Sequence, residues 1–180
     1  MRGFTLIELM VATTILISFL ALGVPTMQNL IERHHTRTDF YTLRKTLASA
    51  RGLAQSKSIN VSVCPTQGQS CSSNWNQSIT TFHDANLNNV IDDGEEVFFN
   101  TTISSRHGYW VKTKAKQNFV RFNPLGHAFS SASTFLYCPF SDHDKLAKSI
   151  VISFQGRIRT VAYLNNRGVP YSHYSSINCD

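Results

Sequence analysis

The sequence predicts an α+β protein in which one long N-terminal helix, first transmembrane and then amphipathic, packs on antiparallel β-sheet. Residues 4–24 form a nearly unbroken apolar run whose only charged side chain is Glu8. The segment that follows carries apolar side chains at helical spacing, and from residue 59 onward short β-type runs alternate with turn residues. One long helix followed by several short strands favours the α+β class.

Length and composition set the scale of this fold. The chain has 180 residues, of which 42% are hydrophobic and 16% are charged, so a collagen-like fibre and wholesale disorder are excluded. This length accommodates one domain, or one domain plus an appendage. Its 17 basic and 11 acidic residues give a formal charge of +6, which favours polyanions or an anionic surface as partners.

The apolar run at the N-terminus is long enough to cross a bilayer as a helix. It is not typical of a cleaved secretory signal, because its basic leader is only residues 1–3 and no Ala-x-Ala site follows it. A carboxylate inside such a helix is costly in lipid, so Glu8 is expected to have a partner or a purpose. The simplest interpretation is a membrane anchor with one anomalous charge.

The leader around Gly3, Phe4 and Glu8 resembles the class III signal of type IV pilins and type II secretion pseudopilins. The resemblance implies a pilin-like fold, and a prepilin peptidase that cuts after Gly3 and methylates Phe4. It also implies that Glu8 pairs with the terminal amine of a neighbouring subunit, which makes two buried charges tolerable. The implied domains are a leader at 1–3, a transmembrane and assembly half of the helix at 4–28, and a periplasmic globular domain at 29–180 that includes the rest of the helix.

The amphipathic half of the helix is expected to continue to about residue 56. At a rise of about 1.5 Å per residue, the whole helix would reach about 80 Å, a length that suits a filament subunit. Its apolar stripe is expected to pack on the globular domain. The stripe comprises Met27, Leu30, Ile31, His34, Phe40, Leu43, Leu47, Ala50 and Ala54.

The rest of the chain is expected to form short antiparallel strands separated by turns rich in Asn, Asp, Gly and Pro. Apolar and β-branched residues recur in each run, and no solenoid repeat is present. The expected strands are residues 59–64, 78–83, 96–102, 109–113, 119–122, 134–138, 149–154 and 157–164.

Four cysteines follow the anchor, and an even number in a domain outside the cytoplasm favours two disulfides. Three pairings are possible. We favour Cys64 with Cys71, which would close a short loop containing Pro and Gly, and Cys138 with Cys179, which would attach the C-terminus to a strand. Free thiols are the alternative. The sequence has no Cys-x-x-Cys pattern, which argues against a zinc or thioredoxin-type site.

Residues 84–95 carry oxygen-bearing side chains at the spacing of an EF-hand calcium loop. Asp84 takes the first place and Glu95 the last, whereas Asn89 stands where such a loop has Gly. The flanking segments are typical of strands rather than helices. We therefore interpret the loop as an Asn/Asp turn without a metal, with calcium binding as the alternative.

The sequence contains no recognisable catalytic pattern. It has no nucleophile elbow, no Gly-rich phosphate loop and no His-Glu-x-x-His. Ser141, Asp142 and His143 are adjacent in sequence, but adjacency does not make the geometry of a catalytic triad. We predict that the protein is not an enzyme and that it uses no cofactor.

Positive charge gathers in the last part of the chain, where residues 105–180 hold ten basic and three acidic residues, a local charge of +7. Arg157 and Arg159 should share one strand face, because side chains alternate, and paired guanidinium groups suit phosphate contacts. Gly156 would let a phosphate backbone come close. A solvated strand face is the alternative. The expected patch also includes Lys112, Lys114, Lys116, Arg121 and Arg167.

Several landmarks together resemble the GspH/FimT family of minor pilins. They are the acidic loop that begins at Asp84, the segment from Arg121 to Gly126, and the run Gly156-Arg157-Ile158-Arg159. Members linked to natural transformation, or competence, carry a Gly-Arg-x-Arg near the C-terminus that is associated with DNA binding. The resemblance implies that Arg157 and Arg159 contact DNA and that Gly156 shapes the turn before them.

Two functions from different classes follow from these patterns. In the first, the protein is a minor type IV pilin that binds DNA non-specifically and supports DNA uptake. In the second, it is a structural minor pilin or a type II secretion pseudopilin that primes or caps a filament without binding DNA. Both functions imply a single-pass inner-membrane protein with a periplasmic domain, with other pilin subunits as partners and with display on the pilus after assembly. The Arg-x-Arg element favours the first function.

Overall fold

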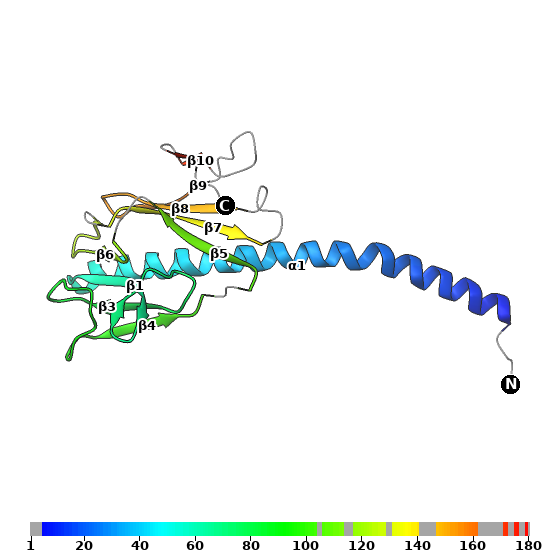
Figure 1. Ribbon diagram of the computed structural model, residues 1–180, viewed down its shortest axis with the longest axis horizontal. Coiled ribbons are helices and arrows are strands. Elements are labelled where there is room, and N and C mark those ends of the chain that lie inside the picture. The colour runs from blue at the N-terminus through cyan, green and yellow to red at the C-terminus, as the bar shows by residue number, and fades with distance from the viewer. Residues whose placement is uncertain are drawn as a thin grey trace. The chain divides into compact units, whose positions relative to one another are not determined.

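The computed structural model describes residues 5–103, 106–113, 117–128, 131–140, 147–161, 171–172, 175–176 and 179. The chain divides into two compact units, residues 1–35 and 36–180. One helix, α1 (Leu6–Lys57), contributes to both units (Figure 1). The expected end of the helix near residue 56 is confirmed. Ser58 adopts a φ of 54° directly after Lys57, a left-handed residue of the kind that commonly terminates a helix.

The first turn of α1 is closed by a capping box between Thr5 and Glu8. The backbone N–H of Thr5 donates to Glu8 Oε2 at 3.0 Å, and the backbone N–H of Glu8 donates to Thr5 Oγ1 at 3.3 Å. This reciprocal pair satisfies two of the amides that a helix start leaves without partners. Within this single chain, Glu8 therefore stabilises the beginning of the helix.

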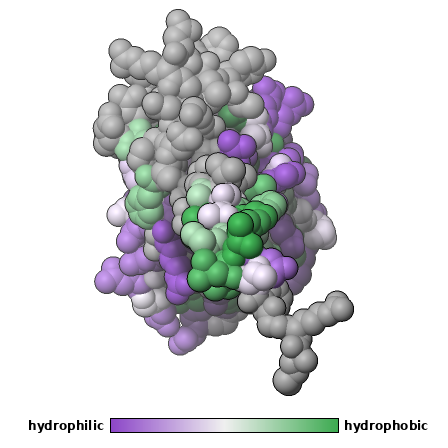
Figure 2. Space-filling model, turned by 90° about the vertical axis from the view of Figure 1, so that its right-hand side faces the viewer, coloured by the Kyte–Doolittle hydropathy of each residue, from purple (hydrophilic) through white to green (hydrophobic). Residues whose placement is uncertain are grey.

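The first unit exposes a dense set of apolar side chains along α1. Figure 2 shows apolar side chains, in green, gathered at this end of the molecule. None of the helices in the described residues is both long enough and apolar enough to cross a membrane. The large exposed apolar residues of this segment include Leu6, Ile7, Leu9, Met10, Val11, Ile15, Leu16, Ile17, Phe19, Leu20, Val24, Met27, Leu30 and Ile31.

The second unit begins where the apolar stripe of α1 becomes buried. Phe40, Leu43, Leu47, Ala50 and Ala54 recur every three or four residues and are at most 1% exposed, as the helical period predicts. The expected extension of this stripe toward the N-terminus is wrong, because the exposed residues of the first unit include Met27, Leu30, Ile31 and His34. Packing of α1 on the sheets therefore starts at about residue 36.

A five-stranded antiparallel sheet packs against this part of the helix. Strand β1 is central, and the neighbours follow the order β2-β1-β3-β4, with β6 also paired to β1. The β1 residue Val61 and the β6 residue Phe122 are fully buried and belong to the same core as Leu47. The strands are β1 (Val61–Gln67), β2 (Ser70–Cys71), β3 (Ile79–His83), β4 (Val97–Thr101) and β6 (Val120–Phe122).

A second antiparallel sheet has the order β5-β7-β8-β9. Its strands contribute Trp110, Phe135 and Ile150 to the core that they share with the helix. The strands are β5 (Gly108–Thr113), β7 (Ser133–Pro139), β8 (Lys148–Ile152) and β9 (Ile158–Val161). A separate pair is formed by β10 (Tyr171–Ser172) and β11 (Ser175–Ser176). A helix followed by antiparallel sheets confirms the α+β class.

Both favoured disulfides are present. Cys64 pairs with Cys71 and ties β1 to the short strand β2, with a Cα–Cα distance of 5.5 Å. Cys138 pairs with Cys179 and fastens the C-terminal segment to β7, with a Cα–Cα distance of 5.6 Å. Leu136, Cys138 and Ala147 form a second, smaller apolar cluster in which Cys179 participates.

Candidate nucleic-acid interface

The turn between β8 and β9 presents the Arg-x-Arg element (Figure 1). Strand β8 ends at Ile152 rather than at the expected residue 154, because residues 153–156 form a tight turn. The N–H of Gly156 donates to the carbonyl of Ser153 at 2.8 Å, and the N–H of Ser153 donates to the carbonyl of Arg157 at 3.1 Å. The N–H of Arg157 donates to Ser153 Oγ at 3.2 Å. Arg157 therefore follows a turn that is closed by hydrogen bonds between Ser153 and both Gly156 and Arg157.

A second tight turn, residues 123–126, lies against the first. The side-chain oxygen of Asn123 accepts the backbone N–H groups of Leu125 and His127 at 3.0 and 2.9 Å. The N–H of Ala128 donates to the carbonyl of Phe154 at 2.9 Å, so the backbone joins the two turns. We call residues 123–126 and 153–156 together the double-turn corner.

Helix α1 holds the double-turn corner in place through two long side chains. Arg51 Nε donates to the carbonyl of Gly126 at 3.0 Å, and a terminal guanidinium nitrogen of Arg51 lies 3.5 Å from the carbonyl of Gln155. Gln55 Nε2 donates to the carbonyl of Leu125 at 3.3 Å. These contacts span 70 residues or more of sequence. The corner is therefore a built feature of the fold and not a loose hairpin tip.

Gly156 is required by this arrangement, but not for the expected reason. Its φ of +71° is in the left-handed region that favours glycine, and the residue is buried. A Cβ at this position would lie 1.8 Å from the carbonyl oxygen of Gly126. The space left by the missing side chain is therefore filled by Gly126, and the expectation that it admits a phosphate backbone is wrong.

Arg157 and Arg159 are both exposed, while Ile158 between them packs against the core. Both side chains are exposed as expected, but Arg157 lies just before β9, which begins at Ile158, so the shared strand face stays a prediction. In the part of the chain that the structure describes, neither guanidinium group forms an ion pair. Arg51 brings a third guanidinium group to the corner, one that the sequence did not single out. Arg51 follows Leu47 by four residues and so borders the buried stripe of the helix, but only the fold brings it to Gly126, 75 residues away.

Lys112 does not belong to an exposed basic patch. It follows Trp110 by two residues in β5 and therefore shares the core-facing side of the strand. Its ammonium group donates to the carbonyls of Gln117 and Phe119 and lies 5.3 Å from the ring centre of Trp75. Burial lowers the pKa of Lys112 to about 8. The expectation that Lys112 contacts a phosphate is wrong, because its ammonium group is already bound by carbonyl groups inside the protein.

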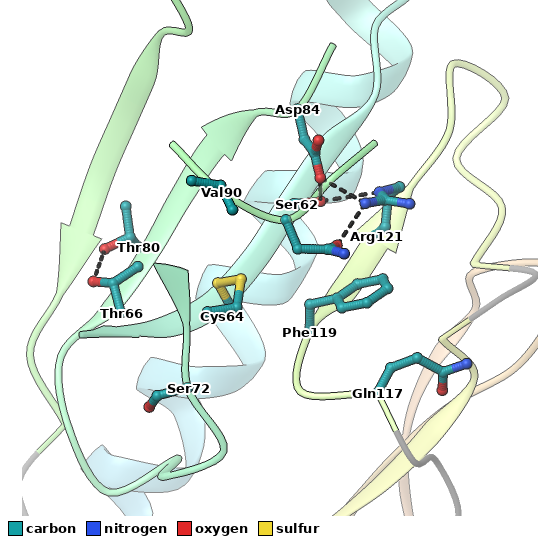
Figure 3. The surroundings of a disulfide bond; sticks show 12 residues. Ser62, Cys64, Thr66, Ser72, Thr80, Asp84, Val90, Gln117, Phe119 and Arg121 are labelled. Atoms are coloured by element: carbon teal, nitrogen blue, oxygen red, sulfur yellow. Dashed lines mark hydrogen bonds and ion pairs between the residues drawn. A yellow bond between two sulfur atoms is a disulfide. The ribbon is translucent and has the colours of Figure 1, made fainter. Parts of the chain in front are cut away.

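Arg121 is also an internal residue. Its Nη2 lies 2.6 Å from Asp84 Oδ2, and its Nε donates to Ser62 Oγ at 3.1 Å. Its side chain is 14% exposed and that of Asp84 is fully buried. Figure 3 shows Arg121 directed toward Asp84 and Ser62, close to the Cys64 disulfide. Arg121 pairs with Ser62 across β1 and β6, so its expected place in the DNA patch is wrong.

The remaining predicted site residues are placed only in part. Glu8 is described and forms the helix cap. Five residues lie outside the described part of the chain, so their predicted roles stay predictions. They are Gly3 and Phe4 at the processing site, and Lys114, Lys116 and Arg167 of the basic patch.

The acidic loop at residues 84–95 is held together by its own polar side chains. The side-chain nitrogens of Asn86 and Asn88 both donate to Asp92 Oδ2 at 2.7 Å. Glu95 Oε1 accepts the N–H of Ala85 at 2.8 Å, and Asp84 is engaged by Arg121 as described above. No group of three or more acidic, His or Cys side chains within the described residues could hold a metal ion. In this structure the loop is therefore a turn held by Asn, Asp and Glu side chains, and calcium binding stays an untested alternative.

The family model "Type II transport protein GspH" matches residues 42–156, a range that ends immediately before Arg157. No curated protein matches the sequence. The range covers the core of the second unit and the double-turn corner, but not the Arg-x-Arg pair.

Three solved structures share the fold. A crystal structure of the type IV minor pilin FimU of Pseudomonas aeruginosa is 18% identical, with a TM-score of 0.56, covering 72% of this chain and 90% of that one. A second crystal form of FimU is 17% identical, with a TM-score of 0.53 and coverage of 69% and 90%. The minor pseudopilin EpsH of the type 2 secretion system of Vibrio cholerae is 10% identical, with a TM-score of 0.52 and coverage of 71% and 96%. At these identities the similarity shows the fold.

Proposed function

The chain belongs to the GspH family of type IV pilin-like proteins, and from that premise we propose that it is a minor pilin that binds DNA non-specifically through the double-turn corner and supports DNA uptake in natural transformation. The contact residues are Arg157 and Arg159. Arg51 holds the two turns through the carbonyls of Gly126 and Gln155, and it adds its positive charge to the corner without being a proposed contact. This proposal is more specific than membership of the family, because similar structures include subunits of pili and of secretion systems.

The observation that carries this proposal is that Arg157 and Arg159 are exposed and, among the described residues, form no ion pair, next to a turn closed by backbone hydrogen bonds. An arginine used for folding has an internal partner, as Arg121 does. Arg157 and Arg159 have no ion-pair partner among the described residues, and both are exposed on either side of the partly buried Ile158. Guanidinium groups held in this way can each donate two hydrogen bonds to a phosphate. The pair therefore supports binding to a polyanion.

The chemistry of the corner favours non-specific binding. Contacts to phosphates carry little sequence information, so affinity should depend weakly on DNA sequence and strongly on salt. Lys112 and Arg121 have partners inside the protein, so few of the described cations remain at the corner to contact DNA. We therefore expect one subunit to bind DNA with a dissociation constant of about micromolar. Several sites on one filament or on neighbouring filaments would increase retention of DNA through avidity.

The N-terminal unit supports the filament part of the proposal. Its helix exposes a continuous series of large apolar side chains, which other pilin helices would cover in a filament. Before assembly, this segment would hold the subunit in the inner membrane with the globular unit in the periplasm. We propose that a prepilin peptidase cuts after Gly3, and that Glu8 then exchanges its cap with Thr5 for the terminal amine of a neighbouring subunit.

Replacement of both Arg157 and Arg159 by glutamine is expected to weaken binding to labelled duplex DNA by about tenfold or more at low salt. The salt slope of the binding constant should also fall by about 2, because each lost phosphate contact releases one counterion fewer. Titrations of the full chain in detergent at about 50 and 200 mM salt would measure both effects.

The matched control removes two exposed charges elsewhere. The pair Arg44→Gln and Lys45→Gln lies on the exposed side of α1 and changes the net charge equally. This control variant should bind DNA within about twofold of the wild-type affinity, because salt screens charges that lie more than about 10 Å from the DNA. Equal affinity of the wild-type and Arg157/Arg159 proteins would exclude these arginines from the site. The structural role as a minor pilin or pseudopilin would then be favoured.

Assembly has a separate expected result. Replacement of Glu8 by glutamine should strongly reduce the amount of protein in sheared filaments from the native host, while Asp93→Asn, an exposed and equal charge change, should not. Mass spectrometry of the mature wild-type chain should show a methylated Phe4 at the N-terminus. A mature chain that retains Met1, or one cut after the apolar run, would contradict this pathway.

A further inference from the structure

The double-turn corner carries two large apolar side chains that the proposed phosphate contacts do not use. Phe154, at the tip of the β8–β9 turn, is 60% exposed, and Leu125, at the tip of the neighbouring turn, is 67% exposed. Isolated exposed apolar residues are ordinary on protein surfaces. These two come from distant parts of the sequence and are brought onto joined turns. Phe154 stands three residues before the exposed Arg157, so the corner offers apolar surface as well as positive charge.

The backbone holds Phe154 firmly although its ring is exposed. Its carbonyl accepts the N–H of Ala128, and its turn is closed by Ser153 on one side and locked against Gly126 on the other. A ring on a fixed backbone loses little conformational freedom when a ligand covers it. By contrast, the exposed ring of Phe140 already has an aromatic neighbour, Tyr109, at 6.0 Å between ring centres.

An aromatic face beside several guanidinium groups is the combination that single-stranded nucleic acids require. Their bases are unpaired and can stack on a side-chain ring, while their phosphates need positive charge close by. In a duplex the bases are stacked on one another, so a ring can reach a base face only by unstacking a base step, which costs a few kcal/mol. The pattern of charges alone would suit both forms of DNA, but the exposed ring of Phe154 favours the single strand.

We propose that the double-turn corner binds single-stranded DNA, with the ring of Phe154 stacked on one unpaired base and with Arg157 and Arg159 on the adjoining phosphates. This inference rests on the proposed DNA-binding function and names the form of DNA that the site takes. Leu125 borders the stacked base on the side of the neighbouring turn. Stacking depends on ring area and not on base identity, so the site remains indifferent to sequence.

The test compares three labelled probes on the full chain in detergent. They are oligothymidylate of about 20 nucleotides, a duplex of the same length, and an abasic strand of the same length that keeps every phosphate but has no bases. Phe154→Ala is expected to weaken binding to oligothymidylate by about tenfold and to change binding to the duplex and the abasic strand by less than about twofold. Phe154→Trp should bind oligothymidylate at least as tightly as the wild type.

Two controls separate stacking from other effects. Phe140→Ala removes an exposed ring outside the corner and should leave all three affinities unchanged. Phe154→Leu keeps an apolar side chain without a ring and should resemble Phe154→Ala. Circular dichroism of each variant would verify the fold. If only Phe154→Ala fails to fold, stacking is tested by comparing Phe154→Leu with Phe154→Trp, of which only the second should bind oligothymidylate as tightly as the wild type.

Each remaining outcome has a distinct meaning. If Phe154→Ala weakens the abasic strand as much as oligothymidylate, or weakens neither, stacking is excluded while the arginine contacts stand. If Phe154→Ala binds all three probes normally but is lost from filaments, Phe154 contacts a neighbouring pilin instead. If the wild-type chain binds none of the three probes, the proposed DNA-binding function itself fails.

Discussion

Replacement of Arg121 by glutamine is expected to lower the free energy of unfolding by about 3–5 kcal/mol. The change leaves the fully buried carboxylate of Asp84 without its guanidinium partner, and an unpaired charge in the interior is costly. It also removes the hydrogen bond to Ser62, which joins β6 to β1 at a point where the two strands are in register. Urea denaturation followed by circular dichroism, with the disulfides intact, would measure the loss.

Arg159→Gln is the matched control for this prediction, because it removes the same side chain from an exposed position on β9. Its effect on stability should be within about 0.5 kcal/mol, while its effect on DNA binding should exceed that of Arg121→Gln. The double variant Asp84→Asn with Arg121→Gln should cost less than the sum of the two single changes, because each single change leaves one buried charge unpaired and the double variant leaves none. Similar small losses for Arg121→Gln and Arg159→Gln would show that the Asp84 pair does not stabilise the fold.

Replacement of Gly156 by alanine is expected to destabilise the protein by about 2–5 kcal/mol and to weaken DNA binding although every arginine is retained. The left-handed backbone accounts for about 1–2 kcal/mol of this loss. The larger part arises because the new Cβ would lie 1.8 Å from the carbonyl oxygen of Gly126, so the two turns must separate. Separation of the turns would displace Arg157 and Phe154 together.

Gly68→Ala provides an unusually close control. Gly68 has a φ of +67°, nearly that of Gly156, but a Cβ there would meet nothing within 4 Å. It should therefore show only the backbone cost, about 1–2 kcal/mol, with normal DNA affinity. Thermal or urea unfolding of the two variants, with parallel titrations of oligothymidylate, would make the comparison. Equal losses of stability in Gly156→Ala and Gly68→Ala would mean that the contact between the two turns does not stabilise the protein.

Local patterns in the sequence were sufficient for the order and type of the main elements. The stripe from Phe40 to Ala54 keeps the helical period and is buried as predicted, and most expected strands lie within a few residues of the observed ones. The two disulfides were favoured from spacing and position, and both are present. The exposure of Arg157 and Arg159 was expected from alternation around Ile158, and both side chains are exposed. The helical stripe and the strands depend on residues close together in the chain, which is why periodicity could predict them, whereas the pairing of Cys138 with Cys179 joins residues 41 positions apart.

The sequence could not decide which charged side chains face the interior. Alternation placed Lys112 on one side of β5, but it could not say that this side is the core, because apolar residues occupy both sides of the strand. Arg121 lies between Val120 and Phe122 and could have pointed to solvent. It is buried because Asp84 and Ser62, from distant parts of the chain, provide its partners.

By itself, then, the sequence determined the helix and the succession of strands, because short-range spacing controls both, and it favoured the two disulfide pairings that the structure contains. Only the tertiary structure decided that Arg121 and Lys112 are internal, that Gly156 makes room for Gly126, and that Arg51 and Phe154 meet at the same corner. The physical reason is that burial, steric fit and charge pairing depend on neighbours in space. Here those neighbours are supplied by segments as much as 104 residues apart, as in the contact between Arg51 and Gln155.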